Sequence, residues 1–291
     1  MNRKKFLQSL ALLPVAGASY KLHHLFSASE SLDPTELMPV LFLGHGSPMN
    51  AIEDNEFARG WRAIGQSLPK PNAILCISAH WETRGTYVTA MEKPKTIHDF
   101  GGFPQALFDV QYPAPGSPAI ANETKEIVKS TTVGLDQSWG LDHGCWSVVK
   151  RLYPAADIPV IQFSLDYQQG PQYHFALAKE LQALRKKGVL IVGSGNMVHN
   201  LGILDWDRPE SGYDWAVEAN TKMKQFITGG DYSSLIHYEA QGKAFQLSIP
   251  TPEHYLPLLY TLGLKTEKDD LSFFNDRTVM GSISMTSLKI G

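Results

Sequence analysis

Three long apolar runs stand out along the chain, each followed by a change to mixed polar and apolar sequence. They cover residues 39–45, 72–80 and 188–195 and are rich in valine, isoleucine and leucine without polar alternation. Strands that are covered on both faces have this composition, because neither face meets water. Residues 158–165 are a fourth candidate strand. Residues 280–290 alternate more strongly, which predicts an edge strand.

Helix-like segments lie between these strands. The pattern predicts helices over residues 117–130, 170–188, 213–230 and 251–263. The last of these is expected to begin with Thr251 as N-cap and Pro252 in the first helical position. Strands interleaved with helices predict an α/β layered domain. Because no linker-like sequence interrupts residues 39–291, they are expected to form a single domain.

Composition and net charge limit the kinds of partner that the chain is expected to bind. The chain has 291 residues, of which 43% are hydrophobic and 19% charged, with a net charge of −3. This is the profile of an ordinary globular protein. Without a basic excess, nucleic acid is not an expected partner. No apolar run approaches the roughly 18 residues that a membrane-spanning helix needs, so no membrane span is expected.

The first 38 residues differ from the rest and predict an export signal followed by a linker. Arg3, Lys4 and Lys5 precede a short apolar stretch and a group of small residues. This layout is typical of export signals. The segment NRKKFLQ also resembles a twin-arginine signal in which Lys4 replaces the second arginine. Export to the periplasm is therefore expected, and an N-terminal helix or tail of a cytoplasmic protein is the alternative.

Histidines occur where the predicted strands end. His45 follows the first strand between two glycines, His80 ends the second, and His199 lies just beyond the 188–195 strand. Ligands of open α/β sheets bind at the carboxyl ends of the strands, so parallel neighbours would bring these imidazoles into one crevice. His143 in a glycine-flanked turn and His254 beside Glu253 extend the set. Neutral imidazole is a common ligand of zinc and of Fe(II).

The two cysteines add no metal ligand set. Cys76 lies in an apolar run, and Cys145 lies close to His143. Two cysteines are too few for a sulfur-based metal site or a disulfide framework. A single bridge between them is left open.

Six segments together resemble one enzyme family. They are GHGSPMNAIEDN, SAHWET, HDFGGFPQALFDVQYPAPG, GLDHGCWSVVKRLYPAADIPVIQFSL, IVGSGNMVHNL and PTPEHYLPLLYTLG. In this order they resemble the DOPA 4,5-dioxygenase branch of the class III extradiol ring-cleaving dioxygenases. The resemblance implies a single α/β catalytic domain over residues 39–291, with a central mixed, largely parallel sheet flanked by helices. It also implies oxygen-dependent opening of a catechol ring beside its two hydroxyls.

The resemblance further implies roles for five histidines. His45, His80 and His254 match the family's metal ligands, and His199 matches its acid/base residue, with a place as fourth ligand left open. His143 matches a residue expected to contact substrate or oxygen. The implied cofactor is one divalent ion per chain, Fe(II) for ring cleavage. An all-histidine triad replaces the two-histidine, one-carboxylate site of many relatives, so zinc is a plausible occupant too.

The expected partners are a catechol and O₂, and the chain is expected to be a monomer or small homo-oligomer. Phe100, Phe103, Phe108 and Tyr112 are candidates for a flat apolar wall beside the ring, or for simple packing of their loop. Two other functions stay open. One is a zinc hydrolase with Glu253 as base, and the other is a non-catalytic metal-binding protein on the same fold.

Overall fold

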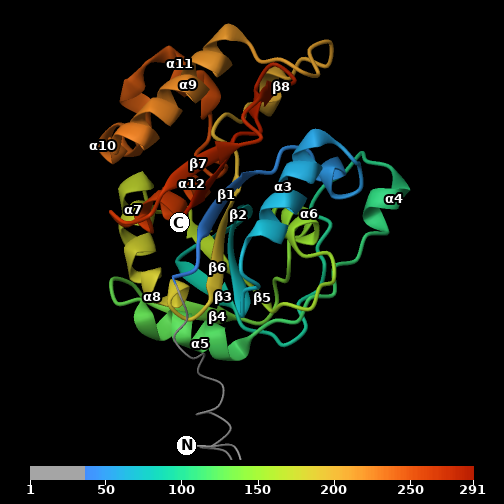
Figure 1. The fold of residues 1–291 in the computed structure, drawn as a ribbon, viewed down its shortest axis with the longest axis vertical. Coiled ribbons are helices and arrows are strands. Elements are labelled where there is room, and N and C mark those ends of the chain that lie inside the picture. The colour runs from blue at the N-terminus through green and yellow to red at the C-terminus, as the bar shows by residue number, and fades with distance from the viewer. Residues whose placement is uncertain (1–36) are drawn as a thin grey trace, which may run out of the picture. The chain divides into compact units, whose positions relative to one another are not determined.

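The computed structural model describes residues 37–291. The predicted export signal and nearly all of its linker lie outside these residues. The described chain forms an α/β domain around an eight-stranded sheet with the order β4-β3-β5-β2-β6-β1-β10-β7 (Figure 1). The strands are β1 Val40–Gly44, β2 Ala73–Thr83, β3 Thr86–Thr89, β4 Val133–Asp136, β5 Val160–Asp166, β6 Val189–Gly195, β7 Leu271–Phe274 and β10 Ser287–Ile290.

The middle of the sheet is parallel, as predicted. Strands β5, β2, β6 and β1 are parallel neighbours, whereas β10 pairs antiparallel with β1 and with β7. Every residue of β1, β5 and β6 is buried, which explains their continuous apolar sequences. The expected mixed, largely parallel sheet is therefore confirmed, and the carboxyl ends of its central strands share one edge.

Helices cover both faces of the sheet (Figure 1). One layer contains α3 Glu56–Ser67 and α6 His143–Leu152, and the opposite layer contains α7 Pro171–Glu180, α8 Gln182–Arg185 and α12 Leu256–Gly263. The remaining helical elements are η3 Pro48–Ala51, α4 Gln105–Phe108, α5 Pro118–Ile127, η4 Leu201–Ile203, α9 Asp214–Gly229, α10 Tyr232–Ile236, η5 Tyr238–Gln241 and α11 Lys243–Ser248. None of the helices within residues 37–291 is long and apolar enough to cross a membrane.

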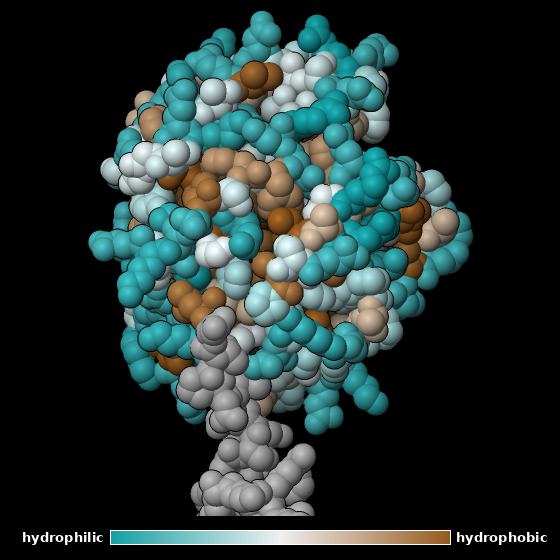
Figure 2. Space-filling model, in the orientation of Figure 1, coloured by the Kyte–Doolittle hydropathy of each residue, from teal (hydrophilic) through white to brown (hydrophobic). Residues whose placement is uncertain are grey.

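The side chains sort between core and surface in the ordinary way. Trp61 of α3 and Trp146 of α6 are completely buried in a core that also contains inward-facing residues of β1, β2 and β6. Figure 2 shows hydrophilic residues over much of one face of the described domain, with smaller hydrophobic areas between them. Cys76 and Cys145 are both buried and free, so the bridge left open by the sequence is not formed.

The predicted helix over residues 251–263 is wrong in its first turn. Residues 251–255 are turns, and α12 begins at Leu256 with Pro257 in its first turn. A helix starting at Pro252 would place Pro257 in its interior, where proline lacks the needed N–H and clashes with the preceding turn. Thr251 does not cap a helix; its hydroxyl donates to Glu253 instead.

The predicted edge strand over residues 280–290 is also wrong. The segment divides into β9 Ile283–Ser284, which pairs with β8 Thr278–Val279, and β10, which lies inside the main sheet. Its serine and threonine hydroxyls are buried rather than solvated, because they bond to backbone groups or to the side chains of Asn220 and Asp276. The Ser287 hydroxyl, for example, accepts a hydrogen bond from the Gly44 N–H at 3.0 Å. Polar alternation therefore came from internal hydrogen bonding and not from a solvated face.

Five α-helices have no counterpart in the predictions, namely α3, α4, α6, α10 and α11, and one predicted helix is divided into two. The predicted helix 170–188 is divided at Leu181 into α7 and α8. Helix α3 was missed although it carries a signal: Asn55 caps it, and Phe57, Trp61 and Ile64 follow at helical spacing. Helix α6 was missed as well, because its first residues were interpreted as a turn.

Candidate metal centre

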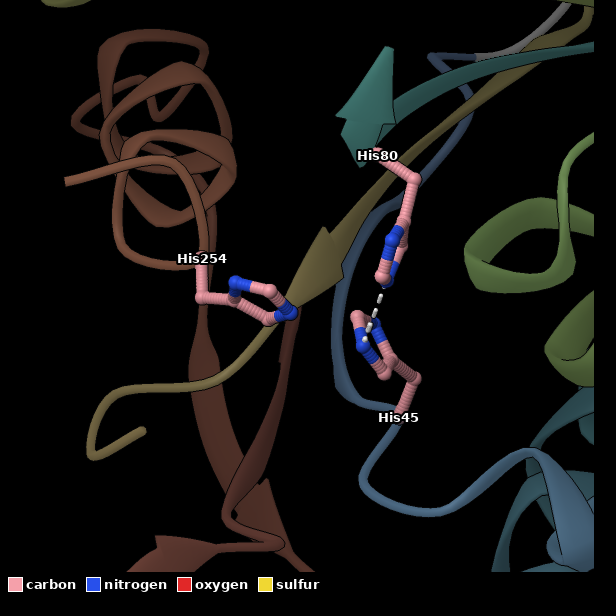
Figure 3. Close-up of side chains that lie close together, drawn as sticks. All are labelled: His45, His80 and His254. Atoms are coloured by element: carbon pink, nitrogen blue, oxygen red, sulfur yellow. Dashed lines mark hydrogen bonds between the residues drawn. The ribbon is translucent and has the colours of Figure 1, made fainter. Parts of the chain in front are cut away.

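Three of the predicted site histidines converge at the carboxyl edge of the parallel strands. His45 follows β1, His80 lies in β2, and His254 lies in the turn before α12. Their ring centroids are 5.0–5.2 Å apart in all three pairs. One nitrogen of each ring lies within 4.8 Å of one nitrogen of both others. Figure 3 shows the three rings facing one another from their separate elements.

The tautomer of His45 follows from its hydrogen bonds. The Ser194 hydroxyl donates its single proton to the Gly144 carbonyl at 2.5 Å and lies 3.0 Å from His45 Nδ1. Ser194 must therefore accept a proton from Nδ1, since a hydroxyl has only one to donate. His45 Nε2 is left with a free lone pair. This lone pair faces His80 Nε2 at 3.3 Å.

The other two imidazoles have the same arrangement with carboxylates. His254 Nδ1 lies 3.0 Å from Glu253 Oε1, and His80 Nδ1 lies 3.5 Å from Asp99 Oδ2. A carboxylate accepts protons, so it favours the tautomer with hydrogen on Nδ1 and a lone pair on Nε2. Metal-binding histidines in proteins almost always have such an outer partner for the nitrogen that does not bind the metal.

The donor set fits a divalent metal ion. Zinc–imidazole bonds of about 2.0–2.1 Å in tetrahedral geometry place two ligand nitrogens roughly 3.3–3.4 Å apart, and the two Nε2 atoms of His45 and His80 are 3.3 Å apart. Burial, and to a smaller extent the neighbouring imidazoles, lower the pKa of all three imidazoles, to about 4 for His80. Neutral imidazole is the form that binds metals.

His199 lies against this cluster but in a different manner. Its ring stacks on that of His254, with centroids 3.4 Å apart and planes 7° from parallel. Its backbone N–H donates to the Ser248 carbonyl, and it bridges Ile283 of β9. His199 shares a potential ligand group with Glu253 and His254. Burial lowers its pKa to about 4.

His143 completes the five predicted residues, although its local structure differs from the prediction. It is not in a turn but is the first residue of α6, and Asp142 is the N-cap. Its ring centroid lies 3.9 Å from that of His80. Gly144 lets the helix approach this closely, because a Cβ there would lie 2.7 Å from His80 Cδ2. All five histidines therefore belong to one cluster.

A buried carboxylate fixes this end of α6. Asp142 has no exposed surface and accepts hydrogen bonds from four donors. The donors are the Ser78 hydroxyl, the Cys145 backbone N–H, the Gln162 amide and the Trp139 indole, at 2.6–3.2 Å. The side chain thus ties α6 to β2 and β5 and holds His143 beside His80. Asp142 could have been recognised in the sequence as the N-cap of α6, but the other hydrogen-bond partners of its carboxylate could not.

Three of the four residues considered for the aromatic wall form one aromatic group beside His143. The ring of Phe100 meets that of His143 edge-on at 5.4 Å, and Phe103 and Phe108 pack against Phe100. Tyr112 does not belong to it. That side chain is buried in the core, and its hydroxyl donates to the Tyr153 carbonyl.

Gly195 is expected to be indispensable for placing His254. The Asn196 N–H donates to the His254 carbonyl at 2.8 Å, and a Cβ on Gly195 would overlap the same carbonyl oxygen. A Gly195→Ala protein should therefore bind zinc at least about 10-fold more weakly, as for other losses of ligand positioning, and lose about 1–3 kcal/mol of stability. The matched control is Gly229→Ala in α9, where a Cβ meets nothing within 4 Å. Equal zinc affinity of the two variants in a chelator competition would contradict this account.

The fold and the histidine cluster together define an α/β protein with a set of potential metal ligands at the carboxyl edge of its parallel strands. A family model described as the catalytic LigB subunit of aromatic ring-opening dioxygenase matches residues 39–265. The chain therefore belongs to this family, and it is an extradiol ring-opening dioxygenase of the 4,5-DOPA dioxygenase type. Enzymes of this class use a metal ion, and the histidine groups described above could bind one.

Known proteins resemble the chain over most of its length. The 4,5-DOPA dioxygenase extradiol of Escherichia coli K12 is 49% identical over 258 residues, covering 87% of this chain and 95% of that protein. The Beta vulgaris protein of the same name is 35% identical, covering 85% and 94%. A crystal structure of an uncharacterized E. coli K12 protein superposes with a TM-score of 0.77 at 44% identity. That match covers 87% of this chain and all of the other.

Proposed function

We propose that the chain cleaves the ring of a catechol such as L-DOPA beside its diol, inserting both atoms of O₂. In this proposal His45, His80 and His254 hold one Fe(II) ion through Nε2. The observation that carries it is the convergence of these three nitrogens, each ring having its Nδ1 against an outer acceptor. The relatives in E. coli and Beta vulgaris are named 4,5-DOPA dioxygenases, which supports a catechol of this size as substrate.

Iron rather than zinc is proposed because the reaction needs redox chemistry. When bound, Fe(II) supplies electrons for oxygen activation and open positions for a chelating diol, whereas zinc has no accessible second oxidation state. The imidazoles of His45, His80 and His254 would hold the ion. Their neutral donor set carries no charge of its own, so it suits either metal. The zinc form is expected to bind but not to turn over.

His199 is proposed as the base that takes a proton from a catechol hydroxyl. With a pKa of about 4 its ring is neutral at physiological pH, and so it has a nitrogen free to accept a proton. Its stacking on His254 keeps it beside the ligand set. His143, beside His80, is proposed to contact the oxygen or the substrate. Phe100, edge-on to His143, would form one wall for the aromatic ring.

The hydrolase alternative is not favoured by the surroundings of Glu253. Its Oε1 lies against His254 Nδ1 and accepts from the Thr251 hydroxyl. A carboxylate held in this way orients a ligand rather than acting as a free base for water.

Oxygen consumption tests the proposal directly. Metal-free protein would be loaded anaerobically with Fe(II), given L-DOPA or simpler catechols, and exposed to air while oxygen and a yellow product are followed. Oxygen uptake matched to product, and absent from the zinc-loaded protein, is expected. No uptake with any catechol, despite bound iron, would refute the proposed activity.

The His199→Ala protein is expected to keep its metal and lose most of its turnover. Loss of a general base lowers rates by about 10²- to 10⁴-fold, while the three proposed ligands stay in place. The measurement is kcat with Fe(II)-loaded protein beside an iron assay. His237→Ala is the control, because that exposed ring contacts only the Ser233 carbonyl. Turnover that survives in His199→Ala would show that another group is the base.

A further inference from the structure

We propose that Asp99 is a positioning residue that sets the tautomers of His80 and His143 together. The inference rests on the proposed metal site, but it concerns a residue to which the sequence assigned no role. Asp99 lies in the loop that leads to Phe100, and its side chain is 19% exposed. One carboxylate thereby links a proposed ligand to the neighbouring proposed substrate-contacting histidine.

The two oxygens of Asp99 have different partners. Oδ1 accepts a hydrogen bond from the His143 backbone N–H at 2.8 Å. Oδ2 lies 3.0 Å from His143 Nδ1 and 3.5 Å from His80 Nδ1. The approach to His143 Nδ1 is close but off-axis, so it is an electrostatic contact rather than an aligned hydrogen bond. Asp99 thus anchors the start of α6 with one oxygen and faces two imidazoles with the other.

This placement decides where the imidazole protons reside. A carboxylate only accepts, so both rings are most stable with hydrogen on the Nδ1 that faces it. His80 Nε2 is then free to bind a metal, and it is this atom that lies 3.3 Å from His45 Nε2. His143 Nε2 is likewise left unprotonated. A proton on His80 Nε2 would remove the lone pair that the proposed metal site requires.

Asp99 also completes a pattern within the site. The Nδ1 atom of His45 faces the Ser194 hydroxyl, and that of His254 faces Glu253. Within residues 37–291, Asp99 is the one acceptor that faces His80 Nδ1 and His143 Nδ1. Of the three outer partners, Asp99 alone contacts two histidines of the cluster. Its removal should therefore disturb both metal binding and the group beside the metal.

The decisive substitution is Asp99→Asn in the full chain. Asparagine can keep the acceptor for the His143 N–H, but it then presents an amide N–H₂ to the imidazoles. Each ring facing a donor must move its proton to Nε2, which blocks the metal lone pair. We expect zinc affinity, measured by chelator competition, to fall by about 10- to 100-fold, the usual cost of losing an outer partner of a ligand. Asp99→Ala should give a similar loss.

Control measurements separate this role from a purely structural one. Asp109→Asn makes the same change in an exposed side chain that accepts only from Gln105, and it should leave zinc affinity unchanged. In the unsubstituted zinc-loaded protein, ¹⁵N NMR of the imidazoles should show hydrogen on Nδ1 of His80 and His143. That readout does not depend on whether any variant folds.

Three results would overturn the inference. The first is wild-type zinc affinity in Asp99→Asn with a loss only in Asp99→Ala, because Asp99 would then serve only as a backbone anchor. The second is protonated Nε2 in either histidine. The third is two zinc ions per chain with Nδ1 atoms as ligands. If the Asp99→Asn effect appears but Fe(II)-loaded protein never consumes oxygen, the positioning role stands and the proposed ring cleavage fails.

Discussion

The His45→Ala protein is expected to lose its metal ion and, with it, all measurable ring cleavage. His45 provides one of the three imidazole nitrogens that converge in the proposed site. Loss of an outer partner of a ligand already weakens metal binding by about 10- to 100-fold, so loss of a ligand should cost more than about 100-fold. Chelator competition with zinc and oxygen uptake with Fe(II) measure the two effects separately.

His237→Ala is again the matched control, because it removes an imidazole of the same size from an exposed position. It should bind zinc and consume oxygen like the unsubstituted protein. Unchanged zinc affinity in His45→Ala would remove His45 from the ligand set. That result would also leave the 3.3 Å approach between the two Nε2 atoms without a chemical explanation.

The Asp269→Ala protein is expected to be less stable by about 3–5 kcal/mol, the usual cost of removing one partner of a buried ion pair. Asp269 binds Arg185 through two hydrogen bonds of 2.8 Å, and both side chains are buried. Arg185 also donates to the carbonyls of Met38 and Leu264. The substitution would leave a guanidinium inside the protein without its counter-charge.

Urea unfolding monitored by tryptophan fluorescence measures this loss. The control is Asp270→Ala, because this neighbouring side chain is exposed and only its backbone carbonyl takes part in a hydrogen bond, from Gly291. It should change stability by less than about 0.5 kcal/mol. Equal unfolding midpoints for the two variants would show that the buried pair contributes nothing.

The same pair predicts a pH dependence. Burial by itself would raise the pKa of Asp269, but hydrogen bonds from Arg185 and Thr266 outweigh it and hold the pKa at about 2. Because this value is below the ordinary one of about 3.9, the contribution is complete above that pH and is lost as the pH falls toward 2. The stability difference between the unsubstituted protein and Asp269→Ala should narrow over this interval.

Much of the fold and the membership of the site followed from the sequence. Residues 39–45, 72–80, 158–165 and 188–195 were predicted as strands, which the structure confirms as β1, β2, β5 and β6, and three of these runs ended near a histidine. Parallel strands align their carboxyl ends, so those histidines had to meet at one edge. The sequence also proposed His143 and His254 as members of the set, and both belong to the observed cluster. Helix boundaries were less certain, as the turn before Pro257 shows.

Only the tertiary structure decided which groups surround the histidines. Ser194, Asp99 and Glu253 set the three imidazole tautomers, yet Ser194 is 149 residues from His45 along the chain. The tertiary structure also placed β10 inside the sheet, where the buried hydroxyl of Ser287 is hydrogen-bonded to the backbone of Gly44. Periodicity in a sequence reports how much of each element is buried. It does not report which distant polar atoms meet, because those contacts depend on how strands and helices pack in three dimensions.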